Sequence, residues 1–112
     1  DALGPGVPIA HVDEVVHDYF AEQGIEELAR HHVGHNIGMG GHEPPYIDRG
    51  WGEYDYVEDG DEVMRAGHVH TIEPGIYTEE FGYRHSDTVA VTEEGTEMLT
   101  HFPRDLASNV IG

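Results

Sequence analysis

The feature that most constrains the fold is a segment rich in glycine and histidine at residues 31–45, HHVGHNIGMGGHEPP. It contains four glycines and four histidines, and a Pro-Pro pair closes it. Glycine admits many backbone conformations and proline removes a helical hydrogen bond, so a regular helix is disfavoured here. We predict a loop that separates helical sequence before it from strand-forming sequence after it.

The sequence before this loop predicts one amphipathic helix over residues 11–23. Its apolar residues recur at spacings of three and four, which places them on one face. These residues are Val12, Val15, Val16, Tyr19 and Phe20. Gly24 suits a helix end, the first ten residues form a lead-in rich in Gly and Pro, and residues 25–30 are expected to add a helical turn.

The sequence after the loop predicts strands. Residues 68–77 form one strand with a break at Pro74-Gly75, and residues 83–92 form a second. The turn Glu93-Glu94-Gly95 then leads to a third strand at 96–100, which makes a hairpin with the second. Residues 46–67 are polar and acidic, with a turn signal at Asp59-Gly60, and predict a surface loop. Helix, loop and sheet in this order give the α+β class.

The composition excludes several classes of protein. Five arginines, no lysine and 23 acidic residues give the 112-residue chain a net charge of −18, which would repel the phosphates of nucleic acid. There is no cysteine for a disulfide or a Cys-based zinc site. No apolar run has the length of a membrane span and no signal peptide is recognisable, so we expect no membrane partner and a cytoplasmic location.

The acidic residues are spread along the whole chain, which favours a folded domain with a highly charged surface over an acidic tail. Such a surface repels itself at low ionic strength and tolerates screening salt. We therefore hypothesise a halophilic protein. A domain this small also buries a modest core, so we expect either a homodimer or a part of something larger.

Three groups of residues are candidates for chemistry. The histidines His31, His32, His35 and His42 lie in the glycine-rich loop, where crowded imidazoles can bind a metal ion. Glu73 interrupts an apolar strand just before Pro74-Gly75, a position that suits a carboxylate held at a cleft. For a single histidine an ordinary surface or core residue is the simpler interpretation, and for Glu73 a solvent-facing strand position is about equally consistent with the spacing. The third group is Arg84-His85-Ser86-Asp87, for which an ordinary half-exposed strand is the simpler interpretation.

Three motifs together resemble a known family. They are GHNIGMGGHEPP at 34–45, GHVHTIEPGIY at 67–77 and YRHSDTVAVTEEG at 83–95, in this order. They resemble the C-terminal half of the pita-bread catalytic domain of Xaa-Pro dipeptidase (prolidase), aminopeptidase P, methionine aminopeptidase and creatinase. His31 together with HEPP and IEPGIY is most similar to the prolidase and aminopeptidase P branch. The resemblance implies that residues 1–112 form part of a pita-bread domain with a curved antiparallel sheet.

The resemblance also implies roles for individual residues. The family binds two divalent metal ions, such as Mn, Co or Zn, through two Asp, one His and two Glu. His35 and Glu73 match metal ligands, and Glu73 also matches a residue linked to proton transfer. His42 matches a catalytic residue that contacts substrate and stabilises the tetrahedral intermediate. His31 and Arg84 match substrate-binding positions. The implied substrate is a dipeptide or peptide with proline at its second position.

Two departures from the family pattern affect the metal site. The paired Asp ligands lie upstream of every motif found here, and Asp13 and Asp18 on the predicted helix do not match them. Ser86 stands where the motif has its last ligand Glu, and a neutral hydroxyl is a poor replacement for a carboxylate. On a strand, His85 and Asp87 project to the face opposite Ser86, so neither is expected to replace it.

Three functions follow from the resemblance. The first is the C-terminal part of a metal-dependent Xaa-Pro hydrolase, which is inactive as an isolated chain and needs its N-terminal half. The second is a metal-independent hydrolase like creatinase, which the serine at position 86 favours. The third is a non-catalytic binding module that retains the scaffold. An Asp pair upstream would favour the first, and its absence the second.

Overall fold

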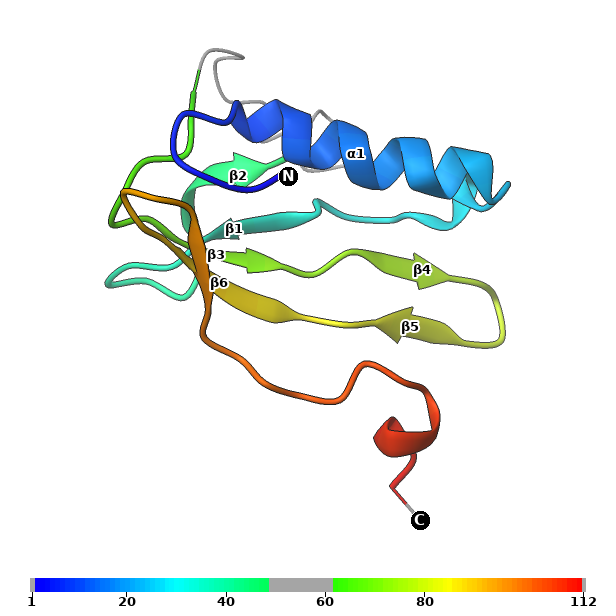
Figure 1. Cartoon of the computed structure of the whole chain (residues 1–112). Coiled ribbons are helices and arrows are strands. Elements are labelled where there is room, and N and C mark those ends of the chain that lie inside the picture. Colours follow the sequence, from blue (N-terminus) through cyan, green and yellow to red (C-terminus); the bar gives the residue numbers. More distant parts are fainter. Residues whose placement is uncertain (1, 49–61, 112) are drawn as a thin grey trace.

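The computed structural model describes residues 2–48 and 62–111 and shows one long helix lying against a curved antiparallel sheet (Figure 1). The α+β class predicted from the sequence is confirmed. The elements are α1 Ile9–Glu22, η1 Glu26–Leu28, β1 Gly34–Asn36, β2 Glu43–Ile47, β3 Val69–Ile72, β4 Gly75–Tyr77, β5 Gly82–Arg84, β6 Asp87–Val91, β7 Thr96–Met98 and η2 Ala107–Asn109.

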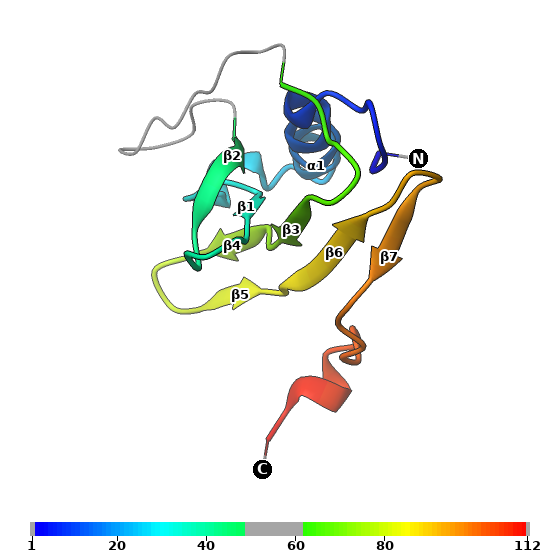
Figure 2. The ribbon, with the colours of Figure 1, turned by 90° about the vertical axis from the view of Figure 1, so that its left-hand side faces the viewer.

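The main sheet has five strands in the order β2-β1-β3-β6-β7, and every neighbouring pair is antiparallel. Strands β4 and β5 continue beyond β3 and β6 as a two-stranded ribbon (Figure 2). The predicted break at Pro74 therefore separates β3 from β4, and the predicted hairpin is the pair β6 and β7.

The core lies between α1 and one face of the sheet. Ile9 and Val12 of the helix are buried in one cluster with Ile47 of β2 and Val91 of β6. Side chains alternate between the two faces along a strand. Tyr46, next to Ile47, therefore projects away from the helix, and so does His35, its partner across β1 and β2. This second face is where the candidate site forms.

The helix differs from its prediction in its start and in its buried face. It begins at Ile9 rather than residue 11, and Val15 and Tyr19, expected in the core, are 41% and 58% exposed. The buried stripe instead includes Asp13 and His17, whose Oδ1 and Nε2 atoms lie 3.7 Å apart. Hydrophobic periodicity cannot anticipate such a pair, because its two polar groups compensate each other.

The loop prediction for residues 31–45 was wrong in part, because β1 and the start of β2 lie within it. Gly34 explains how a strand fits there. A Cβ atom at this position would lie 2.0 Å from the backbone oxygen of Thr71, so β1 approaches β3 more closely than any side chain permits. The second predicted strand is likewise divided into β5 and β6. The predicted turn at Asp59-Gly60 lies outside the described residues.

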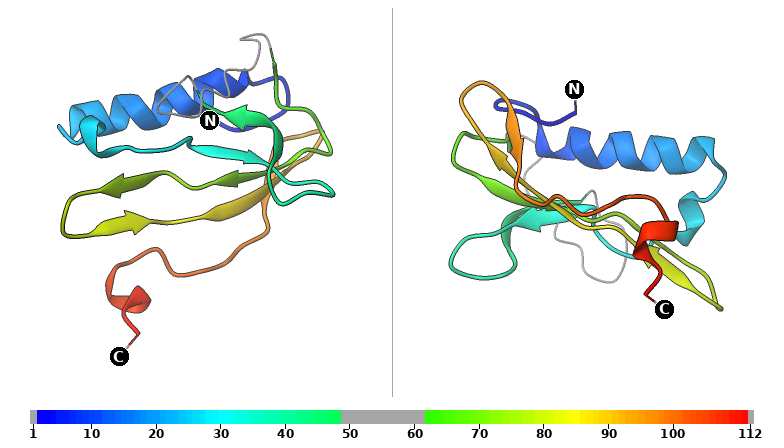
Figure 3. Two further views of the ribbon diagram at one scale, coloured as in Figure 1. Left: turned by 180° about the vertical axis from the view of Figure 1, so that it is seen from behind. Right: turned by 60° about the horizontal axis from the view of Figure 1, so that its bottom comes forward.

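The segment after β7 runs away from the sheet to η2 and the C-terminus (Figure 3). Several large apolar side chains there are exposed, among them Phe102, Leu106 and Ile111. Within the described ranges, no helix combines the length and the apolar character needed to cross a bilayer.

Candidate metal and peptidase site

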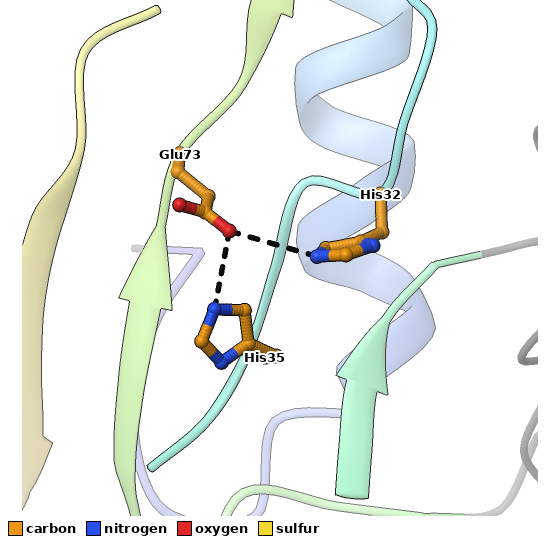
Figure 4. Close-up of side chains that lie close together, drawn as sticks. All are labelled: His32, His35 and Glu73. Atoms are coloured by element: carbon orange, nitrogen blue, oxygen red, sulfur yellow. Dashed lines mark ion pairs between the residues drawn. The ribbon is translucent and has the colours of Figure 1, made fainter. Parts of the chain in front are cut away.

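The candidate site is centred on Glu73, the residue that follows β3. The Nε2 atom of His35 lies 3.2 Å from Oε1 of Glu73, and the Nε2 atom of His32 lies 3.5 Å from the same oxygen (Figure 4). His35 and Glu73, the two metal ligands implied by the sequence, are thus brought together from β1 and the end of β3, and His32 joins them.

His35 is oriented by its backbone neighbours. The backbone N–H of His35 donates to the side-chain Oγ1 atom of Thr71 on β3, at 3.1 Å. Its Nδ1 atom lies 3.0 Å from the carbonyl oxygen of Asn36, which can only accept, so Nδ1 carries the proton. In the neutral ring, Nε2 therefore presents its lone pair to the carboxylate of Glu73.

Glu73 is ionised in this setting. The hydrogen bond from His32 lowers the pKa of its carboxyl group most, while burial acts to raise it. The positive charge of His35, when its ring is protonated, and that of Arg84 lower it further, and the net direction is downward. The site therefore combines an anionic oxygen with two imidazole nitrogens, which are groups that bind divalent metal ions.

The other residues implied by the sequence surround this centre. The exposed ring of His42 stacks on His35, with centroids 4.0 Å apart and an interplanar angle of 30°. The ring of His31 lies edge-on to that of His32, with centroids 5.9 Å apart, and its Nε2 atom is 2.8 Å from the hydroxyl of Tyr77. Arg84 is exposed on β5 and contributes positive charge near Glu73.

Ser86 faces the site from the break between β5 and β6, rather than from a strand as predicted. Its hydroxyl donates to Oε2 of Glu73 at 3.5 Å. His85 and Asp87 are directed elsewhere and pair with each other at 3.6 Å, and Asp87 also accepts a hydrogen bond from Arg104 at 2.7 Å. Neither belongs to the group around Glu73, so the missing carboxylate is not replaced from this strand.

Sequence reasoning missed two contributors. His32 was part of the predicted histidine cluster, but the resemblance gave it no role; its signal was its place in the cluster. Tyr77 was not singled out, although its hydroxyl contacts His31. A Cβ atom on Gly75 would lie 2.7 Å from this hydroxyl and 2.8 Å from Nε2 of His31. The glycine of the Glu-Pro-Gly bend thus makes room for this contact.

The donor set fits a divalent cation. Among the described residues, His32, His35 and Glu73 form a group whose ligand atoms all lie within 4.8 Å of one another. Without a cation, the lone pair of neutral His35 would face a carboxylate oxygen, a repulsive contact that a proton or a metal ion relieves. Glu43, next to His42, is engaged elsewhere: its carboxylate accepts a hydrogen bond from the N–H of Gly40.

Comparison with known proteins decides the family. Residues 1–93 match metallopeptidase family M24. The chain belongs to this family. Its fold is accordingly the C-terminal part of the pita-bread fold, and the resemblance to the prolidase and X-Pro aminopeptidase branch is confirmed.

Relatives cover nearly the whole of this M24 chain. A probable dipeptidase PepE of Mycobacterium tuberculosis is 38% identical over 107 residues, which is 95% of this chain and 26% of that protein. The crystal structure of dipeptidase PepE from Mycobacterium ulcerans has a TM-score of 0.81 at 38% identity, with coverage of 95% and 26%. The prolidase from Pyrococcus horikoshii has a TM-score of 0.80 at 34% identity, with coverage of 93% and 28%. The chain thus spans about a quarter of the length of these relatives.

Proposed function

We propose that this chain is the C-terminal part of the catalytic domain of a metal-dependent hydrolase that cleaves the bond before proline, in Xaa-Pro dipeptides or at peptide N-termini. One observation carries the proposal: Nε2 of His35 and Oε1 of Glu73 converge at 3.2 Å on the sheet face away from α1, beside His42. Relatives named X-Pro aminopeptidase, prolidase and Xaa-Pro dipeptidase support the choice of substrate.

The metal ion would be held by His35 and Glu73. When bound, a divalent ion lowers the pKa of a coordinated water and polarises the scissile carbonyl. Glu73 carries the negative charge required of a ligand, because its pKa is lowered by His32, His35 and Arg84. The same carboxylate is placed to accept a proton from the attacking water.

His42 acts on the substrate in this proposal. Its ring is exposed and stacked on His35, so a ring N–H is available to the developing oxyanion next to the metal position. His31 is fixed by Tyr77 and by the carbonyl oxygen of His32, which its Nδ1 atom contacts at 2.7 Å. His31 and Arg84 bind the substrate and orient the peptide for attack.

The rest of the catalytic domain supplies what residues 1–112 do not match, above all the Asp pair of the family motif. We propose that the partner is this N-terminal half, with a second copy of the chain as the other possibility, and that the isolated chain does not turn over substrate. The proposed setting is the cytoplasm of a halophilic cell, consistent with the net charge of −18 and the absence of cysteine.

A second candidate is metal-independent hydrolysis of the creatinase type. The observation that favours it is Ser86, which offers Glu73 a hydroxyl at 3.5 Å where the motif has a ligand carboxylate. His42 would then be the acid and base, and Glu73 would bind a small amide- or amidine-like substrate. A non-catalytic binding module is the remaining alternative.

A chimera tests the proposal. The dipeptidase relative of Mycobacterium tuberculosis supplies the remaining domain, and this chain replaces its aligned segment. We expect hydrolysis of Xaa-Pro dipeptides that needs added metal, with kcat reduced about 100-fold or more by His42→Ala. The exposed His101→Ala serves as the matched control and should leave the rate unchanged.

The alternatives give other results in the same chimera. Turnover of a small amide or amidine in the presence of a chelator would favour the creatinase type. A folded, metal-loaded chimera that hydrolyses no Xaa-Pro dipeptide, even after Ser86→Glu restores the carboxylate, would contradict the proposal and favour a binding module.

A further inference from the structure

We propose that this chain holds one divalent transition-metal ion by itself, with His32 as a third ligand beside His35 and Glu73. In this site an imidazole takes the place of the carboxylate that the chain lacks at Ser86. The preferred ions are zinc and cobalt rather than manganese or magnesium. The site rests on the two ligands of the proposed function, His35 and Glu73, but it needs neither the Asp pair nor turnover of a peptide.

The three proposed ligand groups lie close enough together to bind a single ion. The Nε2 atoms of His32 and His35 approach the same oxygen of Glu73, at 3.5 and 3.2 Å, and all three ligand atoms lie within 4.8 Å of one another (Figure 4). The site is sheltered, since His35 and Glu73 are 3% and 8% exposed. The side chain of His32 is 21% exposed and leaves the site open to an incoming ion.

The hydrogen bonds of His35 leave its Nε2 atom free of a proton and able to bind an ion. The Nδ1–H of His35 is directed at the carbonyl oxygen of Asn36, so its Nε2 lone pair faces the cluster. A ligating histidine is commonly fixed in this way, with its other ring nitrogen donating to a backbone carbonyl. His31 contrasts with it: both of its ring nitrogens have partners, His32 O at 2.7 Å and Tyr77 Oη at 2.8 Å, so it offers no lone pair to the centre.

The ligand atoms determine which metal ions the site prefers. Two imidazoles and one carboxylate form a ligand set found in catalytic zinc sites, which leave a fourth position open. Imidazole favours zinc, cobalt and nickel, whereas manganese and magnesium prefer oxygen ligands. With a hydroxyl at position 86, the described site has two nitrogen ligands and one carboxylate, and so differs in metal preference from a site rich in carboxylates.

Calorimetric titration of zinc chloride into the metal-free 112-residue chain tests the proposal. We expect one ion per chain, and His32→Gln should raise the Kd at least about 100-fold, because even groups behind the ligands typically contribute 10- to 100-fold. His35→Gln should do the same. The matched controls are two exposed histidines, His11→Gln and His101→Gln, which should leave the Kd within about twofold.

His11 is an informative control because its Nδ1 atom lies 3.6 Å from Glu14 on the surface of α1, where an ion could bind adventitiously. If His11→Gln abolishes binding while His32→Gln keeps the wild-type Kd, the proposal is overturned. Loss of binding in Ser86→Ala would also overturn it, because Ser86 is not a ligand in this site.

Two measurements keep the test decisive if a variant does not fold. In the cobalt-loaded wild-type chain, the ring protons of His32 and His35 should show large paramagnetic NMR shifts, and those of His101 should not. An unshifted His32 ring would contradict the proposal. Competition should show manganese binding at least about tenfold more weakly than zinc. These readouts involve no substrate, so their outcome is independent of peptide hydrolysis in the chimera.

Discussion

Ser86 alters the charge of the site by one unit relative to the family motif. Its hydroxyl lies 3.5 Å from Oε2 of Glu73, so a carboxylate at this position would lie beside that of Glu73. A glutamate here would add a hard oxygen ligand of the kind that manganese prefers. We expect Ser86→Glu to strengthen manganese binding about tenfold or more, as measured by the EPR signal of free Mn²⁺ during titration.

Ser108→Glu adds the same charge at an exposed position near the C-terminus and serves as the control. Equal manganese affinities in the two variants would show that general attraction, rather than ligation at position 86, causes the effect. In the absence of metal, the new carboxylate beside Glu73 should raise the pKa of both acids and lower the free energy of unfolding.

His70 is a second residue with a measurable consequence. It is fully buried on β3, and neither ring nitrogen has a hydrogen-bond partner among the described residues. Burial lowers its pKa from 6.5 to about 4, and the neighbouring His68 and His35 act in the same direction. The folded chain therefore keeps His70 neutral at a pH where the unfolded chain binds a proton.

Because of this difference in bound protons, acid lowers the free energy of unfolding. The stabilisation from neutral His70 is fully present above pH 6.5 and is lost as the pH falls from 6.5 towards 4. At about 1.4 kcal/mol for each pH unit, the loss is about 3 kcal/mol. His70→Leu should remove this part of the pH dependence in urea unfolding, and the exposed His101→Leu should keep it. An unchanged slope in His70→Leu would contradict the assignment.

At the scale of elements, the close approach of β1 to β3 positions His35 opposite Glu73. It depends on Gly34, where a Cβ atom would lie 2.0 Å from the backbone oxygen of Thr71. Gly34→Ala must therefore push the strands apart, and we expect a loss of about 1–3 kcal/mol in the free energy of unfolding. Gly95→Ala, where nothing lies within 4 Å of the added atom, should change it by less than about 0.5 kcal/mol.

Metal binding provides a second readout for the strand pair. If Gly34→Ala still folds, displacement of β1 should also weaken zinc binding, because the next residue is His35. Equal stability of the two alanine variants would mean that β1 shifts without cost, and this result would contradict the role assigned to Gly34.

The elements were predictable where local chemistry dominates. The strand break at Pro74 and the hairpin of β6 and β7 follow from turn residues and from alternating side chains. Gly24 ends the helical region with a φ of +69°, a conformation that favours glycine. The two central site residues, His35 and Glu73, followed from the motifs that contain them.

The features that could not be predicted from the sequence depend on contacts between distant parts of the chain. The strands within residues 31–45 form because β1 pairs with β2 and β3, and no local propensity in a glycine-rich segment indicates this. The burial of Asp13 with His17 likewise depends on where the sheet lies. His32 gains a role only because the fold brings Glu73, 41 positions later in the sequence, to its ring.

At the scale of the whole molecule, the net charge of −18 is the dominant electrostatic property. Only five arginines oppose 23 acidic residues, and two of these arginines have ion-pair partners among the described residues, Arg65 with Glu62 and Arg104 with Asp87. The surface therefore repels itself most in the folded state, where the charges lie closest together.

Screening salt should therefore stabilise the fold. The Debye length falls from about 30 Å at 0.01 M salt to about 3 Å at 1 M, which removes most of the repulsion between exposed carboxylates. We expect the Tm to rise by at least about 5 °C between these concentrations of KCl, equivalent to about 1 kcal/mol for a domain of this size.

NaCl at the same ionic strength should raise the Tm by the same amount if screening is the cause. Near the isoelectric point, the same increment of salt should have little effect, because the carboxylates are then largely balanced or protonated. A Tm that is the same in dilute buffer and in molar KCl would contradict the halophilic hypothesis.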